Sequence, residues 1–204
     1  MIIDCIADLH GYLPKLAGGD LLIVAGDLTA RDEPLEYLDF LSWLEDQDYA
    51  KKFVVPGNHD GQIYSGVSWV DKYILDRCLD DLDRIRVYGF PHTSWFPNVN
   101  PGCDYYMLEK GVMEEAVGLM PNDLDILISH GPPWGILDRK KTKGKHLGCK
   151  HLLKYVTQNP PKLHVFGHIH EGYGEKKVGN THFVNCSIMN GYYEPVNKPI
   201  RVVL

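Results

Sequence analysis

The sequence predicts an α/β fold in which two sheets pack face to face and helices cover their outer faces. Two observations support this prediction. Early in the chain, short apolar runs alternate with loops and with segments of helical periodicity, and the late part is rich in strand-like sequence. The 204 residues contain no internal repeat, low-complexity tract or linker, so we expect residues 1–204 to form a single domain.

Strands are predicted where short apolar or β-branched runs end in polar or turn-forming residues. Leu21 to Ala25 is apolar at every position, as expected for a strand that is covered on both faces. In chain order, the other predicted strands are Ile2 to Ala7, Lys52 to Val55, Ile85 to Phe90, Leu124 to Ser129, Leu163 to Phe166, Thr181 to Cys186 and Ile200 to Leu204.

Helices are predicted where apolar residues recur at three- and four-residue spacing. Between Pro34 and Asp48 such a stripe contains Leu35, Leu38, Phe40, Leu41 and Leu44. The same pattern predicts helices over Val67 to Leu82, Glu114 to Leu119 and Lys150 to Gln158. An aromatic loop is expected from Pro91 to Asn100.

The composition limits which binding partners and which cellular compartment we expect for this protein. The net charge of −6 gives no general attraction to long nucleic acid or to anionic membranes, and no apolar run is long enough to span a bilayer. The chain enters a predicted strand at Ile2 without a basic leader. The five cysteines show no close pairing, which favours reduced thiols, with Cys5 and Cys186 in the core. We therefore expect a cytoplasmic protein.

Five short segments carry side chains suited to holding metal ions, and four of them directly follow a predicted strand. Alone, each segment is weak evidence, because a Gly-Asp pair is usually a turn. Together and in order, at strand ends that converge on one sheet edge, they predict two metal sites. The segments are Asp8-Leu9-His10, Gly26-Asp27, Gly57-Asn58-His59-Asp60, Ser129-His130-Gly131 and Gly167-His168-Ile169-His170.

The residue types and spacings suit this chemistry. In extended chain, residues i and i+2 point the same way, so Asp8 can reach the same cation as His10. The two oxygens of Asp27 can bridge two metals, and Asn58 offers a neutral oxygen. Oxygen and nitrogen donors without a thiolate suit manganese, iron, cobalt, nickel or zinc.

The ordered motifs resemble the calcineurin-like metallophosphoesterase superfamily. Ser129 to Asp138, Gly148-Cys149 and Pro161 to Gly174 are also similar to its metallophosphoesterase-domain-containing subgroup and the bacterial and phage relatives of that subgroup. The resemblance implies a four-layer α-β-β-α sandwich with two mixed sheets. It implies two divalent ions, with manganese favoured. The first ion would be held by Asp8, His10, Asp27 and His170, and the second by Asp27, Asn58, His130 and His168.

The implied reaction is hydrolysis of a small phosphodiester, such as a cyclic nucleotide, by a metal-bridging hydroxide. His59 would protonate the leaving group or stabilise its charge. Asp60 either orients the His59 imidazole or caps the following turn. A phosphomonoesterase or phosphoprotein phosphatase on the same site is the alternative. A non-catalytic scaffold is disfavoured because all ligands and His59 are present, and a nuclease is disfavoured by the acidic charge balance.

Candidate substrate contacts are Asn58, His59 and Trp134, which lies four residues after His130. The loop from Gly89 to Phe96 either stacks on a flat leaving group or packs onto the sandwich. The basic segment Arg139 to His146 either attracts phosphates or is a solvated loop. The expected partner is a small phosphoester, with no membrane and no long nucleic acid. The sequence sets no oligomeric state.

Overall fold

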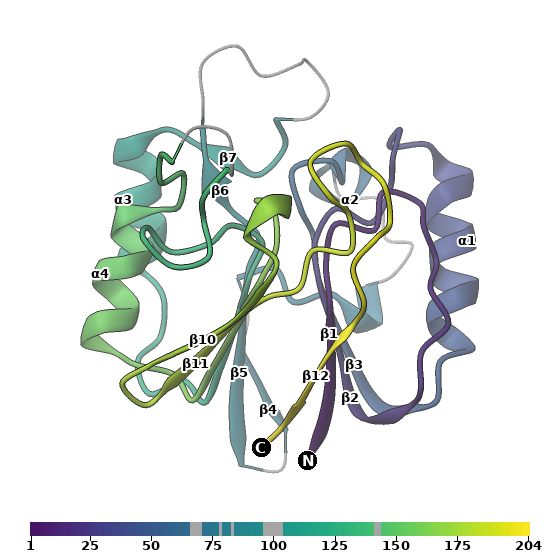
Figure 1. Ribbon diagram of the computed structural model, residues 1–204, viewed down its shortest axis with the longest axis horizontal. Coiled ribbons are helices and arrows are strands. Elements are labelled where there is room, and N and C mark those ends of the chain that lie inside the picture. Colours follow the sequence, from purple (N-terminus) through teal and green to yellow (C-terminus); the bar gives the residue numbers. More distant parts are fainter. Residues whose placement is uncertain (66–70, 78, 83, 96–103, 141–143) are drawn as a thin grey trace.

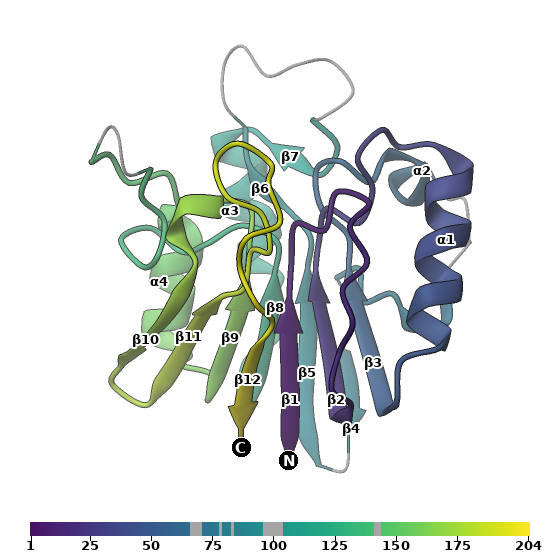
Figure 2. The same ribbon diagram turned by 45° about the vertical axis from the view of Figure 1, so that its right-hand side comes forward.

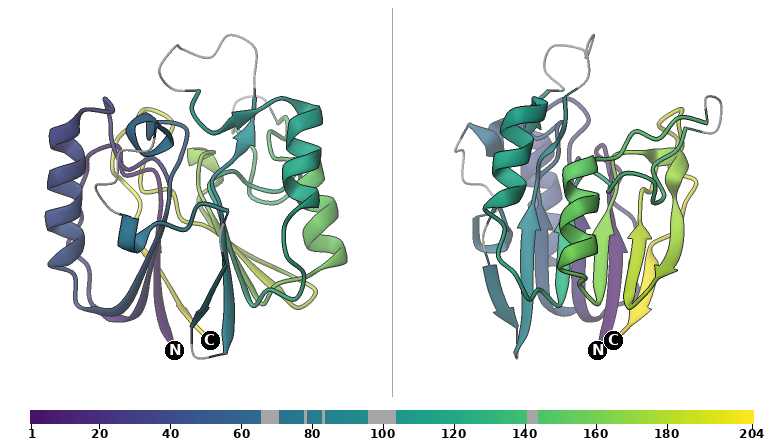
Figure 3. Two further views of the ribbon diagram at one scale, coloured as in Figure 1. Left: turned by 180° about the vertical axis from the view of Figure 1, so that it is seen from behind. Right: turned by 90° about the vertical axis from the view of Figure 1, so that its left-hand side faces the viewer.

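Four layers make up the structure, a computed structural model that describes residues 1–65, 71–77, 79–82, 84–95, 104–140 and 144–204. Two sheets lie face to face in the middle (Figure 1). Helix α1 (Pro34–Glu45) covers one outer face, and α3 (Lys110–Gly118) and α4 (Lys150–Gln158) cover the other, as the view from behind also shows (Figure 3). The predicted α/β fold with two mixed sheets is confirmed.

The first sheet has four strands and carries both chain ends. Its order is β12-β1-β2-β3, with β1, β2 and β3 parallel and β12 antiparallel to β1 (Figure 2). The Met1 ammonium group donates to the Leu204 carbonyl at 2.6 Å, which joins the two termini at the edge opposite the motif loops. The strands are β1 (Ile2–Ile6), β2 (Gly19–Ala25), β3 (Tyr49–Val55) and β12 (Ile200–Val203).

The second sheet has six strands in the order β10-β11-β9-β8-β5-β4. Its four inner strands are parallel and both outer strands are antiparallel to their neighbours. The strands are β4 (Leu79–Leu82), β5 (Ile85–Phe90), β8 (Ile126–Ser129), β9 (Leu163–Phe166), β10 (Gly174–Val178) and β11 (Thr181–Asn185). The shorter elements are α2 (Gly61–Tyr64), β6 (Thr93–Ser94) and β7 (Met107–Leu108).

Alternation along the strands builds the core. In β1, Ile3 and Cys5 point between the sheets, whereas Ile6 belongs to the apolar cluster under α1. On α1, Tyr37, Phe40 and Leu44 are buried against that same face, at helical spacing. Burial on both faces explains why the central strands read as continuous apolar runs.

Helix α1 begins where the sequence provides a start signal. Pro34 occupies its first turn, where a missing amide donor costs nothing. The Glu36 carboxylate accepts a hydrogen bond from the Glu33 backbone N–H at 3.1 Å, so it satisfies a donor at the helix start. The helix ends at Glu45, three residues before the predicted boundary at Asp48.

The predicted helix over Val67 to Leu82 is wrong in the part that the structure describes. Residues 71–73 form a single 3-10 turn, and Leu79–Leu82 is strand β4, paired antiparallel with β5. The Leu75 backbone N–H donates to the Val54 carbonyl at 2.8 Å, so sheet pairing overrides the local helical spacing. Residues 66–70 lie outside the described part.

The other predicted helices and strands are confirmed within a few residues of their predicted bounds. Strand β10 was not predicted, because its sequence GEKKV is mostly charged and it lies at a sheet edge. Cys5, Cys149 and Cys186 are buried free thiols, which confirms the core placement of Cys5 and Cys186. Among the described residues, no helix combines the length and the apolar character needed to cross a membrane.

Candidate metal centre

All five motifs follow strands, namely β1, β2, β3, β8 and β9, and the structure brings their side chains together at one edge. Three groups of candidate ligands form there among the described residues, and one of them, His10, Asp27 and His59, shares residues with the other two. The first cluster is Asp8, His10 and His170, and the second cluster is Asp27, His130 and His168. Within each cluster the ligand atoms lie within 4.8 Å of one another. The fold thus places residues that are up to 162 positions apart around two common points.

The Asp27 carboxylate faces both clusters. One of its oxygens, Oδ2, lies 3.7 Å from His10 Nε2, and the other, Oδ1, lies 3.3 Å from His130 Nε2. Asn58 joins the second cluster, because its Oδ1 lies 3.0 Å from the same His130 nitrogen. This geometry fits one carboxylate that serves two cations.

The donor set fits divalent ions. His10 Nε2 is buried and makes no hydrogen bond with any described residue, although it points toward the Asp27 carboxylate. A buried polar atom without a partner is costly, and a cation would provide that partner. The remaining donors are carboxylate, amide and imidazole groups, which suit first-row transition metals.

Four of these residues have left-handed backbone conformations. The φ angle is 55° at Asp8, 44° at His10, 55° at Asp27 and 67° at His168. Such angles are uncommon outside glycine and persist when the surrounding structure holds them. Their concentration at the ends of parallel strands turns the side chains of separate loops toward the same point.

Two glycines let the loops come this close. A Cβ atom on Gly57 would lie 2.3 Å from Asp27 Oδ1 and 2.4 Å from the Asp27 nitrogen. A Cβ atom on Gly167 would lie 2.5 Å from Asp8 Oδ2. Any side chain at either position would therefore displace a carboxylate of the candidate site.

Backbone carbonyls orient two of the imidazoles. His130 Nδ1 lies 2.8 Å from the Ala25 carbonyl oxygen, and His170 Nδ1 lies 2.9 Å from the Asn190 carbonyl oxygen. Each contact leaves Nε2 to face its cluster, an arrangement typical of histidine ligands. On Asp8, the Ser187 hydroxyl donates to Oδ2, and the His168 backbone N–H lies 2.9 Å from both oxygens.

In the second cluster, the charges of Asp27 and His130 shift each other's pKa values, and both also act on the pKa of His168. Burial acts to raise the pKa of Asp27, but the His130 imidazole holds that pKa well below its usual value. Burial acts to lower the pKa of His130, and the Asp27 carboxylate overcomes this and raises it to about 9. For His168, burial and then the charge of His130 lower the pKa to about 3. Asp27 is therefore ionised, and a positive charge beside it is favourable.

His59 lies beside the clusters. Its ring centroid is 4.7 Å from that of His10, and one of its ring nitrogens lies within 4.8 Å of a ligand atom of His10 and of a ligand atom of Asp27. Its backbone N–H donates to Asp27 Oδ1 at 2.9 Å. The half-buried imidazole can therefore reach a group bound between the clusters.

Asp60 is fully buried and binds backbone rather than a ring. Its carboxylate accepts hydrogen bonds from the Gly57 N–H at 2.7 Å and the Leu28 N–H at 3.0 Å. Burial raises its pKa to about 8, and the neighbouring Asp27 charge adds to this effect. The side chain makes no cap hydrogen bond to α2. Asp60 thus ties the loop after β3 to the loop after β2, which holds Asn58 beside Asp27.

Trp134 and the basic segment contact each other. The Trp134 ring, 37% exposed, lies 4.8 Å from the His146 ring and 5.6 Å from the Lys150 ammonium group. His146 also contacts Asp138 at 2.5 Å and accepts from Arg139 at 3.0 Å. Two members of the predicted basic segment are thus held in a local network. Residues 141–143 lie outside the described part.

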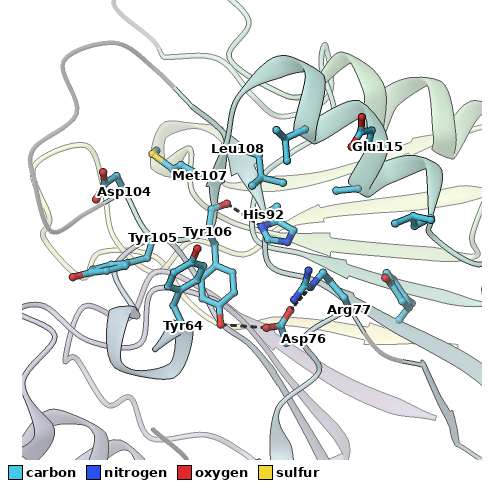
Figure 4. Close-up of a pocket in the computed structure, with 14 residues that line it drawn as sticks. Tyr64, Asp76, Arg77, His92, Asp104, Tyr105, Tyr106, Met107, Leu108 and Glu115 are labelled. Carbon is cyan, nitrogen blue, oxygen red and sulfur yellow. Dashed lines mark hydrogen bonds and ion pairs between the residues drawn. The ribbon is translucent and has the colours of Figure 1, made fainter. Parts of the chain in front are cut away.

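A separate pocket of about 910 Å³ lies beside α3 (Figure 4). His92 from the predicted aromatic loop lines it, and the rings of Tyr64 and Tyr106 meet there at 5.0 Å. Asp76, which also lines this pocket, accepts a hydrogen bond from the Tyr106 hydroxyl and pairs with Arg77. As far as the described residues go, its lining includes none of the candidate ligands. Trp95 is 47% exposed, and Phe96 lies outside the described part.

Three residues of the site were missed in the sequence. Ser187, Asn190 and Tyr193 all lie in the loop after β11. The Tyr193 ring centroid is 4.9 Å from that of His10 and 5.1 Å from that of His170. The sequence did offer one signal for them. Ser187 is a polar residue that directly follows a predicted strand, as four of the five motifs do.

Comparison with known proteins agrees with this geometry. A model of the calcineurin-like phosphoesterase family matches residues 1–172. The chain is 35% identical to human Metallophosphoesterase domain-containing protein 1, over 98% of this chain and 70% of that protein. It is 30% identical to an uncharacterised protein of Methanocaldococcus jannaschii, over 98% and 93% of the two chains.

A solved structure shows the same fold at low identity. Phosphopantetheinyl Hydrolase from Mycobacterium tuberculosis superposes with a TM-score of 0.67 at 15% identity, over 98% of this chain and 95% of that one. The candidate metal clusters, the family match and the relatives agree. The chain belongs to the calcineurin-like phosphoesterase family, whose members are metal-dependent phosphoesterases.

Proposed function

We propose that this phosphoesterase hydrolyses phosphodiester bonds in a small substrate, with cyclic nucleotides as the first class to test. The observation that carries the proposal is the position of Asp27, whose two oxygens face the first and second clusters separately. An arrangement of this kind suits paired cations, and paired cations are common at phosphoryl-transfer centres.

Each cluster would hold one ion, with Asp27 shared between the two ions and Asn58 completing the second site. When bound, they supply an activated water and neutralise charge on the phosphoryl group. The oxygen and nitrogen donors support manganese, with iron, zinc, cobalt or nickel as alternatives.

His59 is the proposed proton donor to the leaving oxygen. It stands beside His10, and its backbone is fixed by the hydrogen bond to Asp27. Asp60 would act on it through the backbone, by holding the loop from Gly57 to Asp60 in place. Asn58 would orient a phosphoryl oxygen in addition to its ligand role. Trp134 is the remaining candidate substrate contact, and its ring contacts His146 and Lys150.

The whole chain acts as one domain in this proposal, because both sheets and their shared core are needed to bring the clusters together. The buried free thiols of Cys5, Cys149 and Cys186 support a reducing compartment such as the cytoplasm.

The test is hydrolysis by Mn²⁺-reconstituted protein of bis-p-nitrophenyl phosphate against p-nitrophenyl phosphate, followed by 2′,3′- and 3′,5′-cyclic nucleotides. We expect faster turnover of the diester and no turnover after chelation. Faster turnover of the monoester would favour the alternative function, a phosphomonoesterase, over a phosphodiesterase. Hydrolysis of neither ester with any of the five metals would contradict the proposal.

A further inference from the structure

The loop that joins β11 to β12, residues 186–199, contacts every member of the first cluster. The Ser187 hydroxyl donates to Asp8, and the Asn190 carbonyl oxygen faces His170 Nδ1 at 2.9 Å. The Tyr193 ring lies edge-on to both histidines of that cluster. In Figure 1 this yellow loop lies at the end of the molecule that also carries α2. It forms a wall of the candidate site.

The loop is fixed rather than loosely attached. The Ile188 N–H donates to the Ala7 carbonyl at 2.8 Å, which joins the loop to the end of β1. The Asn190 side-chain oxygen accepts from the backbone N–H groups of Tyr192 at 2.8 Å and Glu194 at 3.1 Å. These bonds close a tight turn around Tyr193. Its φ of 61° is a left-handed conformation that tyrosine adopts when neighbouring bonds hold it.

Tyr193 combines a fixed backbone with high exposure to solvent. The residue is 57% exposed, although its ring contacts His10 and His170. The His170 side chain, by contrast, is only 8% exposed. An exposed aromatic residue beside candidate metal ligands is suited to a binding contact, because a residue needed only for packing would be covered. Tyr193 therefore presents surface to solvent directly beside the first cluster.

We propose that Tyr193 determines specificity by stacking on a planar aromatic group esterified to the bound phosphoryl group. The inference rests on the proposed function, which places that phosphoryl group between the first and second clusters. The Tyr193 ring lies within about 5 Å of the rings of two first-cluster ligands, so a substituent leaving the phosphorus on that side meets it. Aromatic pairing of this kind changes affinity by roughly two- to tenfold.

A role limited to packing makes a different prediction. If Tyr193 only supported His10 and His170, its removal would weaken metal and phosphoryl binding for every ester alike. A stacking role instead changes the ratio between aromatic and aliphatic esters. Tyr192 provides a matched control, because it is the adjacent tyrosine, 86% exposed, without a ring contact to the clusters among the described residues.

The experiment measures binding of phenylphosphonate and methylphosphonate, which resist hydrolysis, to the Mn²⁺-loaded protein by calorimetry. We expect the wild type to prefer phenylphosphonate by roughly fivefold. The preference should vanish in Tyr193→Ala and persist in Tyr193→Phe and Tyr192→Ala, with methylphosphonate affinity unchanged in all three.

Several results would overturn the inference while leaving the proposed function intact. They are equal affinities in the wild type, a retained preference in Tyr193→Ala, a lost preference in Tyr193→Phe, or a parallel loss of both affinities in Tyr193→Ala. A wild-type protein that binds manganese but neither phosphonate would overturn the role of Tyr193, and hydrolysis of bis-p-nitrophenyl phosphate by the same preparation decides whether the proposed function stands.

Discussion

Asp27 concentrates the chemistry of the site in one side chain. Its two oxygens face separate imidazoles, it is buried, and its backbone is left-handed. Left-handed angles at non-glycine residues cost on the order of 1–3 kcal/mol each. That strain persists because Asp60 holds the adjoining loops through their backbone amides. Local stability is therefore given up at the residue that we propose as the ligand shared by both ions.

Asp27→Asn is expected to lose metal from both clusters and activity together. The amide carries no charge and presents only one oxygen, so it cannot serve two cations. Elemental analysis after Mn²⁺ loading and gel filtration measures the loss. Asp39→Asn, at an exposed position of α1, is the matched control and should keep full metal content. Full occupancy in Asp27→Asn would refute a shared ligand.

His59→Ala is expected to lower turnover roughly a hundredfold or more and to keep metal content. The reason is that His59 lies beside the clusters, while the seven proposed ligands remain. Steady-state kinetics and elemental analysis on one preparation measure both quantities. Unchanged turnover would remove His59 from the mechanism, and lost metal would make it a ligand.

Sequence reasoning found the residues that share one rule and missed those that do not. Asp8, Asp27 and His130 could be predicted because each follows a strand that has a parallel neighbour in its sheet. The contact between Ser187 and Asp8 spans 179 positions and joins the two sheets. It depends on how the sheets meet, which no local pattern encodes. Tyr193 was missed for the same reason.

At the scale of elements, the site is a set of strand ends that approach closely. Gly57→Ala would place a methyl group 2.3 Å from Asp27 Oδ1. We expect it to destabilise the protein by roughly 2 kcal/mol and to weaken manganese binding. Gly111→Ala is the control, because its Cβ meets nothing within 4 Å in α3. It should stabilise by about 0.5–1 kcal/mol. Urea denaturation measures the stability of the two variants. Equal changes in their free energies of unfolding would contradict the close approach of Gly57 to Asp27.

The first sheet also carries a pH-dependent link between its strands. Asp4 on β1 accepts from Arg201 Nε and Nη2 on β12, both at 2.8 Å, and from the Tyr49 hydroxyl on β3. Burial acts to raise the pKa of Asp4, but these hydrogen bonds hold it below its usual value. The ionised carboxylate thus stabilises the folded chain above about pH 4, and this is lost as the pH falls through the folded-state pKa.

Asp4→Asn should therefore be less stable than the wild type at pH 7, by roughly 1–3 kcal/mol. Below about pH 4 its stability should fall less steeply than that of the wild type, because the titrating group is gone. Denaturation curves at several pH values measure this difference. Parallel pH profiles for the two proteins would contradict the role of Asp4.

Elements that a local sequence pattern specifies could be predicted, whereas elements that depend on pairing with a neighbouring strand could not. Helix α4 follows from its sequence because Leu152, Tyr155 and Val156 lie on one face. Strand β4 carries apolar residues at a spacing that also suits a helix, and only pairing with β5 decides between the two. Strand β10 has a charged sequence, and its pairing with β11 places it at the sheet edge.

At the scale of the molecule, the site belongs to both sheets. The first cluster joins the end of β1 to the end of β9, and the second joins β2 to β8 and β9. The layers were predictable, because apolar runs and amphipathic helices leave few ways to bury their faces. How closely the two edges meet depends on packing of the shared core, which residue types alone do not fix.

The central claim is that two cations share Asp27 between side chains from both sheets. The most direct measurement is an anomalous difference map from a crystal of the protein soaked in Mn²⁺. We expect two peaks about 3.5–4 Å apart, one within each cluster and both beside Asp27. A single peak, a peak away from Asp27, or no peak after soaking at saturating Mn²⁺ would contradict the account.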